Sequence, residues 1–570
     1  MSALDWIVLS GTLLFIVVYG IWKSRGNKNI EGYLLANKSM PWYMVGISIM
    51  ATQASAITFL SAPGQAYTDG MRFVQFYFGL PLAMIVLSIT FVPIFHRLKV
   101  YTAYEFLENR FDLKTRALTA FLFLIQRGLA CGLTIYAPSI ILSSILGWNI
   151  YWTNIIIGGL VVTYTVAGGT KAVSITQLHQ MAVIFIGMFL AGYMVVHLIP
   201  DNLTLHESLK VAGSMGKLNA IDFTFDLKNQ YNIWSGIIGG FFLALAYFGT
   251  DQSQVGRYLS GKSVGQSRLG LLFNGIIKIP MQFLILMIGA LLFVFYQYHQ
   301  PPLHFNQVEM GKMAKSKYSS EFQNLNVQYQ DLYEQKKLQL DGLTKAIRSG
   351  DEESRHQLGT SMLAKEEQMK EIRTEAMVLM KKNDPLAETN DTNYIFLSFV
   401  TKYLPAGLIG LLIAVIFSAS MSSTASELNA LASTTVIDIV KRFSKKEKSE
   451  KEYLGTSRWI TVFWGMYAIM VAMFANQLGS LIEAVNKLGS LFYGTILGIF
   501  VVAFYFKKIK GSKVFYAALT AEAFVLLSFW LDLTAFLWLN VIGCVLVVFF
   551  AYLFHLADPG RSKILPDARR

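Results

Sequence analysis

Charged side chains are scarce in this sequence: they make up 15% of its 570 residues, whereas 54% of the residues are hydrophobic. A soluble protein of this length would interleave polar residues around its helices, so this balance argues against one. Long apolar runs recur instead, as at 6–22, 155–166 and 535–554. Because a helix needs roughly 20 apolar residues to cross the hydrocarbon core of a lipid bilayer, we expect an all-α polytopic membrane protein.

Cysteine is equally scarce. Cys131 and Cys544 both lie in apolar runs, which indicates buried thiols and not a disulfide framework. The sequence contains no group of His, Asp and Cys with the spacing of a metal site or a catalytic nucleophile, so we do not expect an enzyme. The first apolar run has no basic residues before it and no small-residue cleavage site after it, which favours a span over a cleaved signal.

The net charge of +13 does not indicate a nucleic-acid partner, because the basic residues gather in short loops between apolar runs. Positive loops mark the cytoplasmic side of a membrane protein. The span count places all of these loops on one side, which predicts a multi-pass protein of the cell (inner) membrane with its N-terminus outside and its C-terminus cytoplasmic. The basic loops are 23–38, 97–115, 257–267, 441–456, 507–512 and 558–570.

About thirteen spans can be placed by length and flanking charge. Several are longer than a straight crossing needs, which indicates tilting or a break. The expected spans are 3–22, 40–66, 74–96, 116–146, 150–167, 173–199, 232–256, 268–297, 393–438, 457–475, 479–506, 513–531 and 533–556.

Residues 298–392 interrupt this pattern with a charged, helix-favouring segment on the outer side. A helical hairpin with Ser349-Gly350-Asp351 as its turn fits the sequence. The segment is either a solvated lid or spacer, or a docking site for an unknown partner.

Two spans carry clusters of small and hydroxylated residues, at 50–64 and at 418–429. Such clusters can serve close helix packing. They can also interrupt a helix, which frees backbone carbonyls beside hydroxyl groups, and both are hard oxygen ligands that suit Na⁺. Discontinuous helices around an ion site at the membrane midplane recur in secondary transporters. We therefore predict two interrupted spans that form the two halves of a sodium site.

Five short segments stand out in order along nearly the whole chain outside 298–392: Ala54-Ser55-Ala56, Gly168-Gly169, Tyr247 to Gln252, Arg257-Tyr258-Leu259 and Ser422-Ser423 through Asn429. Together they resemble the sodium/solute symporter family, which includes sodium/glucose, proline, sialic acid, iodide and multivitamin cotransporters. The chain is similar to a bacterial-type member with an outer insert.

The resemblance implies an inverted-repeat, five-plus-five, amino-acid-symporter-like fold with one span before the repeats and two after them. It divides the chain into consecutive parts: 1–39, the first span and its cytoplasmic loop; 40–199, the first repeat; 200–231, an outer loop; 232–297 and 393–506, the second repeat; 298–392, the insert; and 507–570, two spans and the cytoplasmic tail.

The resemblance also implies a set of sodium ligands. The carbonyls of Ala51, Ala54 and Ala419 and the hydroxyls of Ser422 and Ser423 would supply five oxygens. Some relatives hold a second sodium with an Asp, and the matching position here is Gln177, while one partner serine is Ala425 and the other, Ser426, is kept. A neutral amide cannot supply the charge of an Asp, which favours one sodium per cycle.

Solute-contacting positions of sugar-carrying relatives match Lys278, Thr58, Tyr77, Leu80, Ala244 and Asn486. Lys278 lies deep in an apolar span, where it either contacts solute or pairs with Asp251 or Glu483. Leu80 and Ala244 cannot hydrogen-bond a hydroxyl group, and Tyr77 replaces an acidic residue, which argues against a simple hexose.

Other positions resemble the carriers of anions. Arg127 lies in a span where similar sialic acid carriers use an arginine, although it could instead snorkel or form a structural ion pair. Ser55 and Thr58 resemble hydroxyls at the carboxylate end of that pocket, and Tyr247 resembles an inner-gate aromatic beside a break at Gly249-Thr250. Glu427 has no counterpart that we can assign and could add proton coupling.

These features predict a sodium-coupled symporter that imports a small polar or anionic organic solute, such as an organic acid, an acidic sugar or a vitamin-like acid, by alternating access. A neutral-sugar carrier is the first alternative. A membrane sensor with a transporter fold is the second.

Overall fold

The computed structural model describes residues 1–24, 35, 38–98, 100–200, 203–444 and 449–557, and its regular structure there is helical apart from one isolated bridge between Met40 and Gly261. Eight helices are long and apolar enough to cross a membrane, and three shorter apolar helices accompany them in the described ranges. An all-α membrane protein is therefore confirmed, while the number of thirteen spans stays a prediction.

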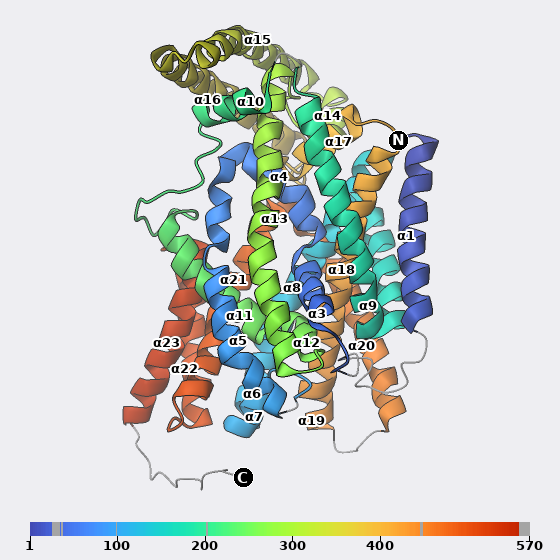
Figure 1. Cartoon of the computed structure of the whole chain (residues 1–570), viewed down its shortest axis with the longest axis vertical. Helices are drawn as coiled ribbons and strands as arrows, with labels where there is room; N and C mark the ends of the chain where they lie inside the picture. The colour runs from blue at the N-terminus through green and yellow to red at the C-terminus, as the bar shows by residue number, and fades with distance from the viewer. Residues whose placement is uncertain (25–34, 36–37, 99, 201–202, 445–448, 558–570) are drawn as a thin grey trace.

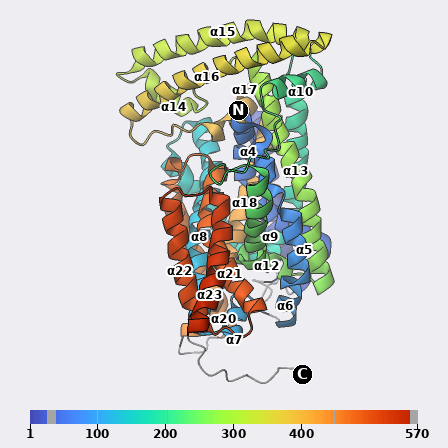
Figure 2. The same cartoon turned by 90° about the vertical axis from the view of Figure 1, so that its left-hand side faces the viewer.

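The helices form an upright bundle with a separate layer across one end (Figures 1 and 2). The bundle contains α1 (Ala3–Ser24), α3 (Trp42–Gln53), α4 (Ala56–Asp69), η2 (Gly70–Tyr77), α5 (Leu80–Ile89), α6 (Phe91–Leu98), α7 (Glu105–Arg110), α8 (Leu113–Leu146), α9 (Ile150–His197), η3 (Ser235–Gly239), α11 (Gly240–Thr250), α12 (Gln252–Leu259), α13 (Val264–Tyr298), α17 (Ile395–Tyr403), α18 (Leu408–Thr434), η5 (Thr435–Val440), α19 (Lys441–Phe443), α20 (Glu450–Ala472), η6 (Ala475–Gln477), α21 (Leu481–Tyr505), α22 (Gly511–Trp530) and α23 (Phe536–Ala557).

The first predicted interruption is present between α3 and α4. Ala54 leaves the helical conformation with φ −82° and ψ 73°, and Ser55 is extended with ψ 171°. Both residues are small and buried at the centre of the bundle, so the backbone can unwind here without displacing a large side chain. The break turns carbonyl groups away from helical hydrogen bonding.

A second interruption separates α11 from α12 at Asp251, the residue after the predicted break at Gly249-Thr250. Asp251 adopts φ −78° and ψ 119°, and its carboxylate accepts a hydrogen bond from the backbone N–H of Ser253 at 2.8 Å. An Asp in this position caps the new helix and stabilises its start.

The prediction of an interruption within 418–429 is wrong, because α18 is continuous from Leu408 to Thr434. Its serine hydroxyls donate to carbonyls one turn back, Ser423 to Ala419 at 3.0 Å and Ser426 to Ser422 at 2.9 Å. Serines bonded in this way are accommodated in a helix, and the alanines between them favour it. The predicted span 393–438 breaks earlier instead, at residues 404–407, where Pro405 and Gly407 (φ +89°) separate α17 from α18.

The helix assigned as α9 covers both predicted spans 150–167 and 173–199. The hydroxyl oxygens of Tyr164 and Thr176 are 2.5 Å apart, although twelve residues of straight helix would separate them by about 18 Å. The chain therefore bends back between these two residues, which gives two arms where two spans are predicted.

The layer across the end of the bundle is formed mainly by α14 (Gln307–Ala314), α15 (Ser319–Ser349) and α16 (Glu352–Asn383), near α10 (Leu205–Ser214) (Figure 2). The short helix η4 (Thr392–Tyr394), which follows this layer in the chain, contacts α4 and α17. The chain turns between α15 and α16 at Gly350, whose φ of +73° suits glycine. The N-terminus lies at this end, whereas α6, α7 and α19 lie at the opposite end (Figure 1).

Candidate sodium and solute sites

The two clusters of small residues meet where α18 crosses the end of α3. The Ser422 hydroxyl donates to the Ala51 carbonyl oxygen at 3.2 Å, and the Ser423 hydroxyl donates to the Ala419 carbonyl oxygen at 3.0 Å. Ala54 lies at the adjacent break. All five predicted ligand residues are buried, with at most 1% of each exposed. The fold thus brings neutral oxygens from α3 and α18 together.

The resemblance matches Gln177 to the position where some relatives hold a second ion. Its side-chain oxygen accepts from the Ser48 hydroxyl at 2.5 Å, and its amide nitrogen donates to Ser426 at 3.0 Å and to Thr52 at 3.3 Å. The amide therefore joins α9 to α3 and α18 with hydrogen bonds. These contacts use the polar groups that a second ion would need.

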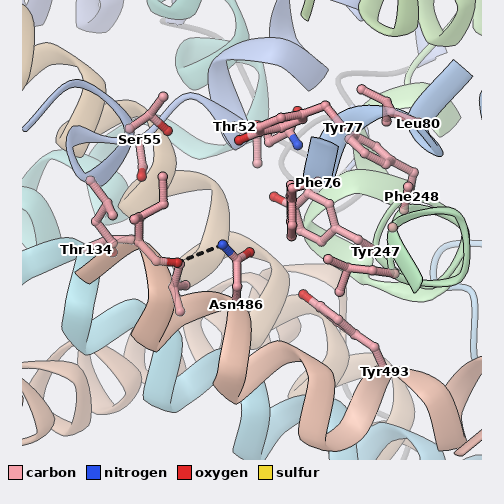
Figure 3. A pocket seen from close by; sticks show the side chains of 18 of the residues that line it. Thr52, Ser55, Phe76, Tyr77, Leu80, Thr134, Tyr247, Phe248, Asn486 and Tyr493 are labelled. Atoms are coloured by element: carbon pink, nitrogen blue, oxygen red, sulfur yellow. Dashed lines mark hydrogen bonds between the residues drawn. The ribbon is translucent and has the colours of Figure 1, made fainter. Parts of the chain in front are cut away.

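A cavity of about 850 Å³ of empty volume, part of it open to solvent, lies between the two broken helices. Figure 3 shows side chains from η2, α11 and α21 facing one another across it. Its lining includes Thr52, Gln53, Ser55, Ile57, Thr58, Phe76, Tyr77, Leu80, Gln126, Arg127, Thr134, Leu243, Ala244, Tyr247, Phe248, Glu427, Ile482, Val485, Asn486 and Tyr493.

Six of the seven predicted solute residues line this cavity: Ser55, Thr58, Tyr77, Arg127, Tyr247 and Asn486. Lys278 is the exception. It is fully buried in α13 with its Nζ 5.9 Å from the centre of the Tyr77 ring, behind the cavity wall. Its Nζ has no hydrogen-bond partner among the residues that the structure describes, so the alternative pairing with Asp251 or Glu483 is absent.

Arg127 holds an ion-pair cluster at one side of the cavity. Its guanidinium contacts the Asp251 carboxylate and donates to Glu427 at 3.0 Å and to the Tyr493 hydroxyl at 2.5 Å. Tyr493 in turn donates to Asp251 at 2.8 Å, and Thr134 donates to Glu427 at 3.0 Å. The cluster joins α8, the α11–α12 break, α18 and α21.

Sequence reasoning did not assign a solute role to Gln53, Thr134, Tyr493 or Glu427, all of which line the cavity. Gln53 precedes the predicted break, and the others are polar residues in apolar spans, which is the signal that could have found them. The side-chain oxygens of Gln53 and Gln126 have no hydrogen-bond partner in the described part of the chain. Two residues of the cavity lining thus have an amide oxygen without a donor from the described protein.

An all-helical bundle with two broken helices around a cavity and an oxygen-rich site is the arrangement of an ion-coupled secondary transporter. Residues 33–308 and 372–521 match the model of the sodium:solute symporter family. The chain belongs to this family. It is a multi-pass membrane transporter, and Na⁺ is its coupling ion.

Three relatives align with more than half of this chain. The sodium-coupled monocarboxylate transporter 1 of Mus musculus is 27% identical over 87% of this chain and 68% of its own length. The sodium-dependent multivitamin transporter of Oryctolagus cuniculus is 26% identical over 89% and 67%. The sodium/iodide cotransporter of Homo sapiens is 29% identical over 52% and 46%.

A solved structure shares the fold. The substrate-bound, outward-open state of a Na⁺-coupled sialic acid symporter superposes with a TM-score of 0.75 over 98% of each chain, at 21% identity.

Proposed function

We propose that this chain imports a small organic acid together with one Na⁺ per cycle. The observation that carries the proposal is the 3.2 Å contact between the Ser422 hydroxyl and the Ala51 carbonyl, which joins the two predicted halves of the sodium site. Sodium would bind to Ala51, Ala54, Ala419, Ser422 and Ser423, between α3 and α18. The amide of Gln177, bonded to Ser48 and Ser426, supports a single ion.

The solute class is supported by the cavity and by the relatives. The names of relatives include monocarboxylate and multivitamin transporters. The hydroxyls of Ser55 and Thr58 and the amides of Gln53, Gln126 and Asn486 offer hydrogen bonds to an acid, while Leu80 and Ala244 give an apolar wall for its carbon skeleton.

Alternating access would couple the two fluxes. A sodium ion between α3 and α18 would hold the unwound residues that border both the ion and the solute cavity, so each ligand would favour binding of the other. Tyr247, next to the α11–α12 break and 5.9 Å from the Tyr493 ring, is the proposed inner gate. The driving force from the potential is about 2.3 kcal/mol per charge at 100 mV.

A neutral sugar is the second candidate, and one observation favours it. Arg127, the cation that lines the cavity, already contacts two carboxylates. The described residues of the lining therefore offer no unpaired cation to an anionic solute. The position of Lys278 behind the wall weakens this alternative, because the lysine of sugar-carrying relatives lies at the solute.

The orientation is part of the proposal. The N-terminus and the α15–α16 layer would face the outside, and the basic loops near α6, α7 and α19 the cytoplasm of the cell (inner) membrane. The layer would act as an outer lid or bind a partner.

A thermal-shift screen of the purified protein tests the solute class. Monocarboxylates, sialic acids, vitamin acids and neutral sugars are compared in Na⁺ and in choline buffers. We expect stabilisation by an acid in Na⁺ alone, followed by Na⁺-driven uptake of that acid into proteoliposomes. Stabilisation by a neutral sugar, or by an acid equally well in choline, would overturn the proposal. Binding without any flux would indicate a sensor.

A further inference from the structure

The ion-pair cluster beside the cavity contains one more carboxylate than it has cations. Arg127, Asp251 and Glu427 are 3%, 1% and 4% exposed, so water screens their charges little. The other titratable groups that face Glu427 are Cys131 on α8 and Tyr247 on α11, both of which are ordinarily uncharged. With both carboxylates ionised, the described cluster has a net charge of −1.

An arginine and one aspartate would already form a neutral pair, so Glu427 is the group that needs an explanation. An uncompensated ionised carboxylate is costly inside a protein. The hydroxyl of Thr134 and the shared guanidinium of Arg127 satisfy its oxygens with hydrogen bonds. They do not remove the excess charge, which requires a further cation.

The proposed sodium site would carry an excess positive charge once the ion is bound. Its five oxygens come from three backbone carbonyls and two hydroxyls, none of which carries a formal charge. Glu427 lies one helical turn beyond Ser423 on α18, and residues four apart on a helix share a face with Cβ atoms about 5–6 Å apart. The excess negative charge therefore lies close to the place where the positive ion would bind.

We propose that Glu427 is the counter-charge of the transported sodium ion. It acts through space, from beyond the ligand set, and it raises the affinity of the neutral oxygen site for Na⁺. This inference rests on the proposed sodium site. At roughly 10 Å and an effective dielectric constant of about 20, one unit charge changes ion affinity about tenfold.

The same charge balance couples sodium to an acidic solute. Without Na⁺, the cluster of Arg127, Asp251 and Glu427 is negative and repels an anion in the cavity that it lines. With Na⁺ bound, cluster and ion together are neutral. An anionic solute should thus bind after sodium, while a neutral analogue of equal size should depend on sodium less.

Sodium binding to the purified protein tests the proposal with three variants. Na⁺ affinity is measured from radioactive sodium binding and from the Na⁺ dependence of the thermal midpoint. Glu427→Gln leaves Arg127 and Asp251 as a neutral pair, so the fold is retained, and we expect Na⁺ binding about tenfold weaker. Glu427→Asp keeps the charge and should stay within a factor of about three.

The double variant Arg127→Gln/Glu427→Gln separates charge from shape. It removes the charges of both side chains but keeps the net charge of −1 on Asp251, so Na⁺ affinity should return close to that of the unmodified protein. Glu522→Gln, a buried carboxylate on α22 away from the cavity, is the matched control and should change nothing.

Unchanged Na⁺ affinity in Glu427→Gln would overturn the proposal, and so would a double variant as weak as the single one. Ser422→Ala/Ser423→Ala is measured beside them. If that variant loses Na⁺ binding while Glu427→Gln keeps it, this inference fails and the sodium site stands. If both keep it, the sodium site itself is wrongly placed.

Discussion

The Ser422 hydroxyl lies 3.2 Å from the carbonyl oxygen of Ala51, 371 positions away in the sequence, and joins a continuous helix to an unwound one. A contact between a donor on α18 and a carbonyl next to a break can be replaced by an ion without refolding either helix. In the proposed sodium site, the two elements would bind and release the ion in this way during transport.

Replacing Ser422 and Ser423 by Ala should abolish Na⁺-dependent uptake, because two of the five proposed ligands are lost. Alanine favours a helix, so the two substitutions should not disturb α18. The elution volume in size-exclusion chromatography and the thermal midpoint in choline buffer should therefore stay the same. Ser433→Ala is the matched control: its hydroxyl donates to Ala430 on the same helix, away from the site. Uptake with unchanged Na⁺ dependence in the double variant would disprove the ligand assignment.

Gln177→Asp combined with Ala425→Ser should create a second sodium site beside Thr52 and Ser426. The added carboxylate supplies the charge that the amide lacks. The sodium dependence of uptake should become sigmoidal, with a Hill coefficient rising from about 1 toward 2. Gln180→Asp, one turn along α9, should leave it hyperbolic. A hyperbolic curve in the combined variant would show that Gln177 alone does not limit the stoichiometry.

Lys278→Met should stabilise the protein and leave uptake within a few fold. The Lys278 ammonium is fully buried without a hydrogen-bond partner among the described residues, so removing it relieves a desolvation cost of about 1–3 kcal/mol. Arg116→Met is the contrast, because Arg116 is buried against Asp438 at 2.6 Å and its loss should destabilise by about 3–5 kcal/mol. Loss of uptake in Lys278→Met at retained stability would place the lysine at the solute.

Glu388, in the loop after α16, should make stability depend on pH. Its carboxylate accepts hydrogen bonds from Tyr394 at 2.6 Å and Tyr136 at 3.0 Å, and burial raises its pKa from 4.5 to about 7. The folded state then holds a proton that the unfolded state releases, so stability falls as pH rises from about 4.5 to about 7. The whole contribution is at most about 3 kcal/mol.

Thermal midpoints between pH 5 and pH 8 measure this effect. Glu388→Gln should flatten the decline, whereas Glu353→Gln, exposed on α16, should reproduce the unmodified profile. An equally steep decline in Glu388→Gln would assign the dependence to another group.

Local sequence was sufficient for features that depend on local chemistry. Small and hydroxylated residues crowd around Ala54 and Ser55 within one span, which is typical of an interrupted transmembrane helix, so the α3–α4 break could be predicted. The same reasoning gave a wrong prediction for α18. The Ser423 hydroxyl donates to the Ala419 carbonyl inside a continuous helix, and the local sequence does not distinguish this arrangement from an unwound backbone with free carbonyls.

The partners of charged residues could not be predicted, because they are set by packing. Arg127 and Asp251 are 124 positions apart, and Asp251 could as well have faced Lys278. Only the crossing of α8 with the α11–α12 break decides between them. The exclusion of Lys278 from the cavity follows from the same packing, since Tyr77 lies in front of it.

The α15–α16 hairpin is fixed to α10 near its turn, where Arg348 of α15 contacts Glu207 of α10 at 2.8 Å and Gly359 of α16 packs against the backbone of Ser214. At about 1.5 Å per residue, the 31 residues of α15 form a strut of roughly 46 Å. A movement that separates α10 from this strut must break that ion pair or bend the helix. The turn of the hairpin and α10 therefore form one unit, which would move together during transport.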